Sequence, residues 1–126
     1  MKRVIQTDKA PKAVGPYSQA VRAGSFLFTA GQIPLDPATG KLVQGGIKEQ
    51  TRRVMENLKA VLEAGGADFS KVVKSTVFLD DLKNFVHFNE VYGEYFPGDR
   101  PARSTFQVAG LPLGSRIEIE MIALVE

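Results

Sequence analysis

The chain has 126 residues, of which 44% are apolar and 24% charged, so residues 1–126 can form one globular domain with a single core. Its 16 basic and 14 acidic side chains give a net charge of +2, and no run of five like charges occurs, so nucleic-acid binding through a concentrated basic face is not expected. Cysteine is absent, which excludes disulfides, thiolate nucleophiles, iron–sulfur clusters and zinc–cysteine sites.

The first third of the chain predicts short strands joined by turns. Residues 2–7 predict a strand, and a loop then leads into the string GPYSQA at 15–20. Residues 19–23 and 26–30 flank an Ala-Gly-Ser turn and predict a β-hairpin, and a DPATG turn precedes a further brief strand at 41–43. No segment is apolar enough to be a signal peptide or to span a membrane, so a cytoplasmic protein is expected.

Two helices are predicted in the middle of the chain. Apolar side chains recur every three or four residues over 47–64, and the Gly65-Gly66 pair suits a left-handed stop. The string VVKSTVFL at 72–79 has apolar groups on both sides and predicts an interior strand. A second helix, at about 84–96, carries an aromatic stripe and His87, the only histidine, which we interpret as a helix-face residue and not as a catalytic base.

The segment GDRPARSTF at 98–106 contains the strongest candidate for a binding residue, Arg103. Pro97 and Pro101 stiffen the chain beside it, and a strand follows at 104–109. A guanidinium mounted at a strand end can bind a carboxylate or phosphate with two parallel hydrogen bonds. On residue type alone, a solvated surface arginine explains Arg103 as well.

The last strand is predicted at 117–125, which gives five or six strands in the order β-β-β-α-β-α-β-β. Two helices can cover one face of such a sheet. Ile122, Leu124 and about half of the apolar groups of VVKSTVFL would then lie on the uncovered face. That is more apolar surface than a soluble monomer usually exposes, so we expect a closed homo-oligomer with sites between subunits.

The segment PARSTFQVAGLPLGSRIEIEM at 101–121 resembles the signature of the RidA/YjgF family of enamine/imine deaminases. Four further strings are similar to that family, and together they cover essentially the whole chain in order: GPYSQA at 15–20, TAGQIPLDPATG at 29–40, VKSTVFLDDL at 73–82 and FNEVYGEYF at 88–96. The resemblance implies an α+β fold of the chorismate-mutase-like type, a homotrimer, and ligand clefts between neighbouring subunits.

The resemblance also implies a substrate class and a set of site residues. The substrates would be short 2-enamino acids, 2-aminoacrylate and 2-aminocrotonate, which are hydrolysed through their imines to 2-keto acids and ammonia. The family's carboxylate-binding arginine corresponds to Arg103, its acid to Glu118, its tyrosine to Tyr17 and its asparagine to Asn89, and Gly31 corresponds to the position where the family's backbone faces the ligand.

Two positions depart from the best-known members of the family. Ala30 stands where many have serine, which removes one possible hydrogen bond to the substrate, and Thr105 stands where many have cysteine. This chemistry needs no thiol, metal or organic cofactor. In it, Arg103 holds the carboxylate, Glu118 or a backbone carbonyl directs water to C2, and Tyr17 supplies or relays a proton. Glu118 could instead be one of two solvent-facing acids on an alternating strand, and Tyr17 could simply pack at the base of a loop.

Two other functions remain open from the sequence. A sensor or chaperone-like trimer could bind small carboxylates without turnover, and the loss of a hydroxyl at Ala30 is the best argument for it. Some relatives have been described as translation inhibitors or ribonucleases. However, the chain offers no histidine pair, no clustered Lys/Arg stripe and no aromatic stacking platform apparent from the sequence for RNA.

Overall fold

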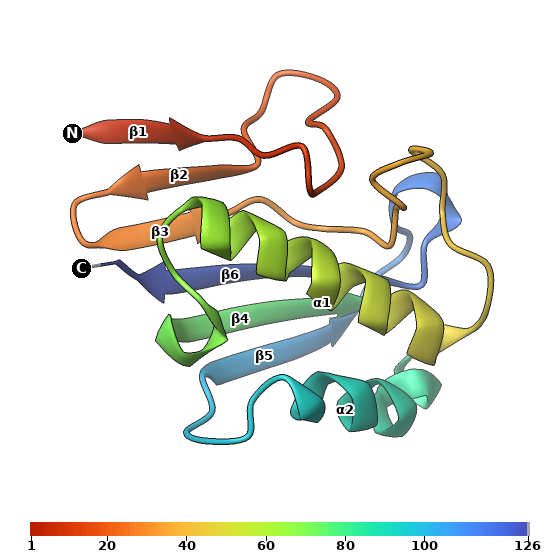
Figure 1. Cartoon of the computed structure of the whole chain (residues 1–126). Coiled ribbons are helices and arrows are strands. Elements are labelled where there is room, and N and C mark those ends of the chain that lie inside the picture. The colour runs from red at the N-terminus through yellow and green to blue at the C-terminus, as the bar shows by residue number, and fades with distance from the viewer. Residues whose placement is uncertain (126) are drawn as a thin grey trace.

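The computed structural model describes residues 1–125 and has one mixed sheet of six strands in the order β1-β2-β3-β6-β4-β5 (Figure 1). All neighbouring strands are antiparallel except β4 and β5, which are parallel. The strands are β1 (Lys2–Ile5), β2 (Ala20–Ala23), β3 (Phe26–Thr29), β4 (Val72–Leu79), β5 (Ala102–Gln107) and β6 (Ile117–Leu124). The predicted hairpin is confirmed, with Gly24 at a φ of 60° in its turn.

The two helices are α1 (Ile47–Ala64) and α2 (Phe85–Glu94), and α1 has the predicted bounds. Glu49 accepts a hydrogen bond from the Gly46 N–H at 2.9 Å, which satisfies one of the free donors at the start of α1. Gly66, with a φ of 87°, provides the predicted left-handed stop. Figure 1 shows α1 lying across one face of the sheet, with α2 beside it near β5.

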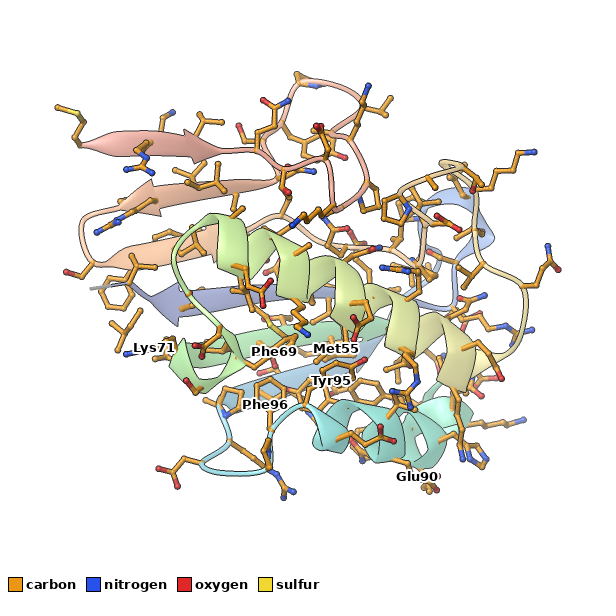
Figure 2. The ribbon with its side chains drawn as sticks, in the orientation of Figure 1. Met55, Phe69, Lys71, Glu90, Tyr95 and Phe96 are labelled. Atoms are coloured by element: carbon orange, nitrogen blue, oxygen red, sulfur yellow. The ribbon has the colours of Figure 1, made fainter. Side chains whose placement is uncertain are left out.

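The core fills the space between α1 and the sheet. Its largest fully buried side chains come from α2, from β3, from one stripe of α1 and from alternate positions of β4 and β6: Phe88, Leu27, Val54, Met55, Leu58, Val61, Leu62, Val77, Leu79, Ile117, Ile119 and Met121. At the end of α2, the rings of Tyr95 and Phe96 pack edge-on against Phe69, at centroid distances of 5.3 and 5.4 Å (Figure 2). These contacts hold the C-terminal end of α2 and thereby position the segment that leads to β5.

Three predicted elements differ from the structure. Residues 41–43 form no strand, because their pairing with the chain near Leu35 is limited to a single bridge between Leu42 and Leu35. The Asn57 side chain holds the Leu35 end of this bridge, since its amide donates to the Leu35 carbonyl at 2.9 Å. The strand expected at 104–109 is β5, which starts directly after Pro101 and ends where its pairing with β4 ends. The second helix, expected over 84–96, is shorter and ends before Phe96.

The face of the sheet opposite the helices is uncovered and largely apolar. Phe28 on β3 is 44% exposed and Phe106 on β5 is 51% exposed, and Phe78 stacks on Phe106. By strand alternation, Ile122 and Leu124 lie on the same face, as the sequence predicted, together with Glu118 and Glu120. The single chain therefore presents a broad hydrophobic surface to solvent.

Candidate functional site

Arg103 lies on the helix-covered face of edge strand β5, where its guanidinium is surrounded by aromatic rings. Its central carbon is 5.4, 5.2 and 5.0 Å from the ring centroids of Phe85, Phe88 and Tyr92, respectively. The predicted aromatic stripe of α2 thus has two roles, because it also packs in the core. Among residues 1–125, no carboxylate forms an ion pair with Arg103. Cation–π contacts fix the guanidinium while leaving its hydrogen-bond donors for an anion.

The Tyr92 ring is itself fixed by a buried hydrogen bond. Its hydroxyl lies 2.6 Å from the Ser75 hydroxyl on β4, and both side chains are buried. Ser75 is the direct neighbour of Arg103 in the parallel β4–β5 pairing. Burial raises the pKa of Tyr92, whereas Ser75 and Arg103 lower it to a smaller extent. Tyr92 is therefore a neutral phenol whose ring is held beside Arg103, a role that the sequence did not reveal.

A pocket of about 500 Å³ opens in front of Arg103. Its lining residues come from α2 and from the segment before β5: Asn89, Tyr92, Gly93, Arg100, Pro101 and Arg103. Asn89 and Tyr92, three residues apart on α2, share one edge of the helix and line the same pocket as Arg103. No acidic side chain lines this pocket, so it suits an anion.

Thr105 lies two residues after Arg103 on β5 but does not line this pocket. By alternation it faces the same side of β5 as Arg103, and its hydroxyl is buried without a hydrogen-bond partner among the described residues. A buried hydroxyl that lacks a partner costs free energy, typically about 1–3 kcal/mol.

A second pocket, of about 420 Å³, contains the other predicted site residues. Tyr17, Ala30, Gly31 and Glu118 line it, together with parts of the loops around them. Glu118 lies directly against Gly31, because a Cβ on that glycine would be 2.8 Å from the Glu118 carboxyl carbon. Glycine at this position is thus required for the carboxylate to reach the pocket. Burial, with a smaller contribution from Glu120, raises the pKa of Glu118.

The loop that carries Tyr17 is held by a buried glutamine. The Gln19 side chain accepts from the Thr7 N–H at 2.7 Å and donates to the Pro11 carbonyl at 2.8 Å. Tyr17 itself is 52% exposed, and its hydroxyl accepts a long hydrogen bond of 3.4 Å from the Val14 N–H. The hydroxyl is therefore accessible at the pocket. Gln19 was not singled out from the sequence, since a glutamine in a loop gives no signal of its buried role.

The two pockets do not meet within one chain. Arg103 lies on the helix-covered face, whereas Glu118 alternates onto the open face of β6, opposite Phe78. The sequence predicted that Arg103 and Asn89 would share a site with Tyr17, Gly31 and Glu118. Within the single chain, Arg103 and Asn89 line one pocket. Tyr17, Gly31 and Glu118 line the other pocket, together with Ala30.

Other features of the described chain do not favour a different site. A hollow of about 610 Å³ lies between α1 and α2, and four of the charged side chains that line it form ion pairs, with Lys48 2.6 Å from Glu90 and Arg52 3.1 Å from Glu94. Figure 2 labels Glu90 on α2, where it lines this hollow. Over residues 1–125 we find no cluster of metal-binding side chains and no helix with the length and apolar character of a membrane span.

Comparisons with known proteins show which family the chain is similar to. Residues 7–125 match the sequence profile of the family described as Endoribonuclease L-PSP. A Mus musculus protein named 2-iminobutanoate/2-iminopropanoate deaminase is 50% identical over 124 residues, which cover 98% of this chain and 92% of the relative. A Myxococcus xanthus relative, Protein DfrA, is 59% identical over 98% of this chain and 95% of its own. The crystal structure of Escherichia coli TdcF with bound serine is 42% identical, with a TM-score of 0.94 and coverage of 98% of this chain and 99% of that one.

Proposed function

The chain belongs to the RidA/YjgF family, and on that premise we propose that it is a 2-iminobutanoate/2-iminopropanoate deaminase. Its substrates are 2-aminoacrylate and 2-aminocrotonate together with their imine tautomers. Protonation of the enamine at the β-carbon gives the imine, water adds to C2, and the C–N bond breaks to release ammonia and a 2-keto acid. Mammalian relatives at 49–50% identity carry the name of this activity, which supports the proposal.

Arg103 supplies the observation that carries the proposal. Its guanidinium lies against three aromatic rings and has no carboxylate partner among residues 1–125. No acidic side chain lines its pocket, so the guanidinium is arranged to bind a planar carboxylate. Binding the substrate carboxylate there fixes C2, and Asn89 on α2 can bond the same substrate. The relative that holds serine also binds a small molecule with a carboxylate.

Glu118 and Tyr17 supply proton transfer in this proposal. The raised pKa of Glu118 suits a general base that directs water to C2 and returns the proton to the leaving nitrogen. Tyr17, with its accessible hydroxyl at the same pocket, relays a proton to or from the β-carbon. The backbone beside Gly31 lines the pocket, so its polar groups can orient the substrate.

The complete site forms between two copies of the chain, in a homotrimer. The Arg103 pocket of one copy and the Glu118 pocket of the next then face each other across the cleft. Two observations support this arrangement: the two pockets are separate in the single chain, and the open face of the sheet exposes Phe28 and Phe106. Burying that face on a second copy removes its apolar area from water.

The test is an assay in which a serine dehydratase generates 2-aminoacrylate in place. The protein should accelerate formation of the keto acid, and Arg103→Ala should lose about ten- to a hundredfold in kcat/KM, because it removes a charge-assisted pair worth roughly 1.5–3 kcal/mol. An Arg3→Ala variant is the matched control, since Arg3 lies on β1 at the opposite edge of the sheet. Equal turnover by Arg103→Ala and the control would remove Arg103 from the mechanism.

One alternative function has an observation in its favour. Ala30 contributes no hydroxyl to the Glu118 pocket, so a trimer that binds small carboxylates without hydrolysing imines fits the same geometry. In the assay above, carboxylate binding without acceleration would support that alternative. Cleavage of RNA has less support despite the family description, because the sole histidine, His87, is an exposed residue of α2.

A further inference from the structure

A second arginine, Arg100, lines the same pocket as Arg103. Its Nε–H donates to the Phe96 carbonyl at 3.4 Å, just beyond the C-terminal end of α2. That contact uses the inner donor of the guanidinium and leaves the two terminal nitrogens for another partner. Pro101, the next residue, stiffens the backbone that joins Arg100 to β5. The side chain is thus attached to a defined position at the pocket wall.

The charges around this pocket are unbalanced. Neither Arg100 nor Arg103 forms an ion pair with a carboxylate of residues 1–125, although Lys48 and Arg52 on α1 both do. The remaining lining groups are an amide, a phenol, a glycine and a proline. One carboxylate bound to Arg103 would neutralise only one of the two guanidinium charges. In the single chain this pocket has a volume of about 500 Å³, which can hold an acid with more than three carbons.

We propose that Arg100 forms a subsite for a second anionic group, so that the pocket prefers dicarboxylates, in particular 2-imino dicarboxylic acids with four or five carbons. This inference rests on the proposed function, which assigns the first carboxylate to Arg103. The second carboxylate, at the far end of the substrate side chain, pairs with the terminal nitrogens of Arg100. A carboxylate suits this position because its two oxygens can accept hydrogen bonds from the terminal nitrogens that the Phe96 contact leaves free.

The binding test compares two stable four-carbon acids, succinate and butanoate, which differ only in the second carboxylate. Their dissociation constants are measured by calorimetry at low salt for the wild-type protein. We expect succinate to bind about tenfold more tightly, the effect of one charge-assisted contact in a partly exposed site. The preference should shrink as salt is added. Equal affinities for the two acids, or no measurable binding of either, would overturn the subsite.

Three variants assign the preference to Arg100. Arg100→Gln should bring the two affinities within about twofold, whereas Arg100→Lys, which keeps the charge, should retain most of the difference. Arg3→Gln, on the opposite edge strand, is the control for general loss of positive charge and should keep the wild-type ratio. A ratio that is unchanged in Arg100→Gln would contradict the proposal. Arg100 is exposed, so its replacement leaves the core intact.

A turnover measurement separates this inference from the proposed function. An amino-acid oxidase generates imines from aspartate and from alanine, and the ratio of their kcat/KM values should fall about tenfold in Arg100→Gln. Tighter binding of succinate that depends on Arg100, without hydrolysis of either imine, would support the subsite and refute the deaminase. Hydrolysis of both imines with an unchanged ratio would support the deaminase and refute the subsite.

Discussion

The hydroxyls of Tyr92 and Ser75 lie 2.6 Å apart in the core, and this contact joins α2 to the strand that pairs with β5. The Tyr92 ring is the nearest of the three rings around the Arg103 guanidinium, at 5.0 Å. Ser75 is next to Arg103 across the strands. This buried hydrogen bond therefore helps to hold the Tyr92 ring in its place beside the guanidinium.

Removing either hydroxyl should make the position of the Arg103 guanidinium less well defined. Tyr92→Phe keeps the ring but leaves the Ser75 hydroxyl without its partner, and we expect a loss of about 1–2 kcal/mol in the free energy of unfolding and a severalfold weaker affinity for small carboxylates. Ser75→Ala should act similarly. The double variant should cost less than the sum of the two, by about 1 kcal/mol, as measured by chemical denaturation. Strict additivity would show that the two hydroxyls act independently.

Gly31 should be intolerant of even one added methyl group. In Gly31→Ala the new Cβ overlaps Glu118, whose flexible side chain must rotate away, so we expect a small change in Tm but a loss of tenfold or more in kcat/KM. Gly110→Ala is the matched control, because a Cβ there meets nothing within 4 Å. Full activity of Gly31→Ala would argue against a catalytic position for the Glu118 carboxylate.

Glu118 should make both activity and stability depend on pH. Burial raises the pKa of Glu118 in the native state above its ordinary value of 4.5. At a pH between the unfolded-state pKa and the native-state pKa, the native state binds more protons than the unfolded state, so stability falls as the pH rises through that range. Glu118→Gln should therefore raise Tm more at pH 7 than at pH 4. Activity should show the opposite trend, because the base must be ionised, and the acid limb of the kcat/KM profile should lie above 4.5. A limb at or below 4.5 would exclude Glu118 as the base.

The uncovered sheet face should make the protein self-associate. Native mass spectrometry of the wild type should give three chains, and Phe28→Glu, which places a charge on the open face, should shift the population to monomers. Lys83→Glu, an exposed position on the turn before α2, is the control and should leave the mass unchanged. A wild-type monomer would undermine a site shared between subunits.

Much of the fold could be predicted from periodicity, because α1, β4 and β6 have strong and regular apolar patterns. The brief strand predicted at 41–43 was wrong, because the pairing of Leu42 with Leu35 stays a single bridge, and how far such a pairing extends is not contained in a local pattern. Arg103 could be predicted as a binding residue from the two prolines that stiffen the chain beside it and from the family resemblance. Its aromatic surroundings, the Ser75 contact and the position of Arg100 were not found, because they depend on which residues the sheet register brings together.

Arg103 of one copy and Glu118 of another should complete one deaminase site, and mixing two inactive variants tests this. Arg103→Ala and Glu118→Gln are unfolded together, refolded as a mixture and assayed with 2-aminoacrylate. In random assembly about a quarter of the clefts contain both native residues, so activity should recover to about a quarter of the wild-type value. If the mixture stays as inactive as the separate variants while forming the same oligomer, the two residues do not act together across subunits.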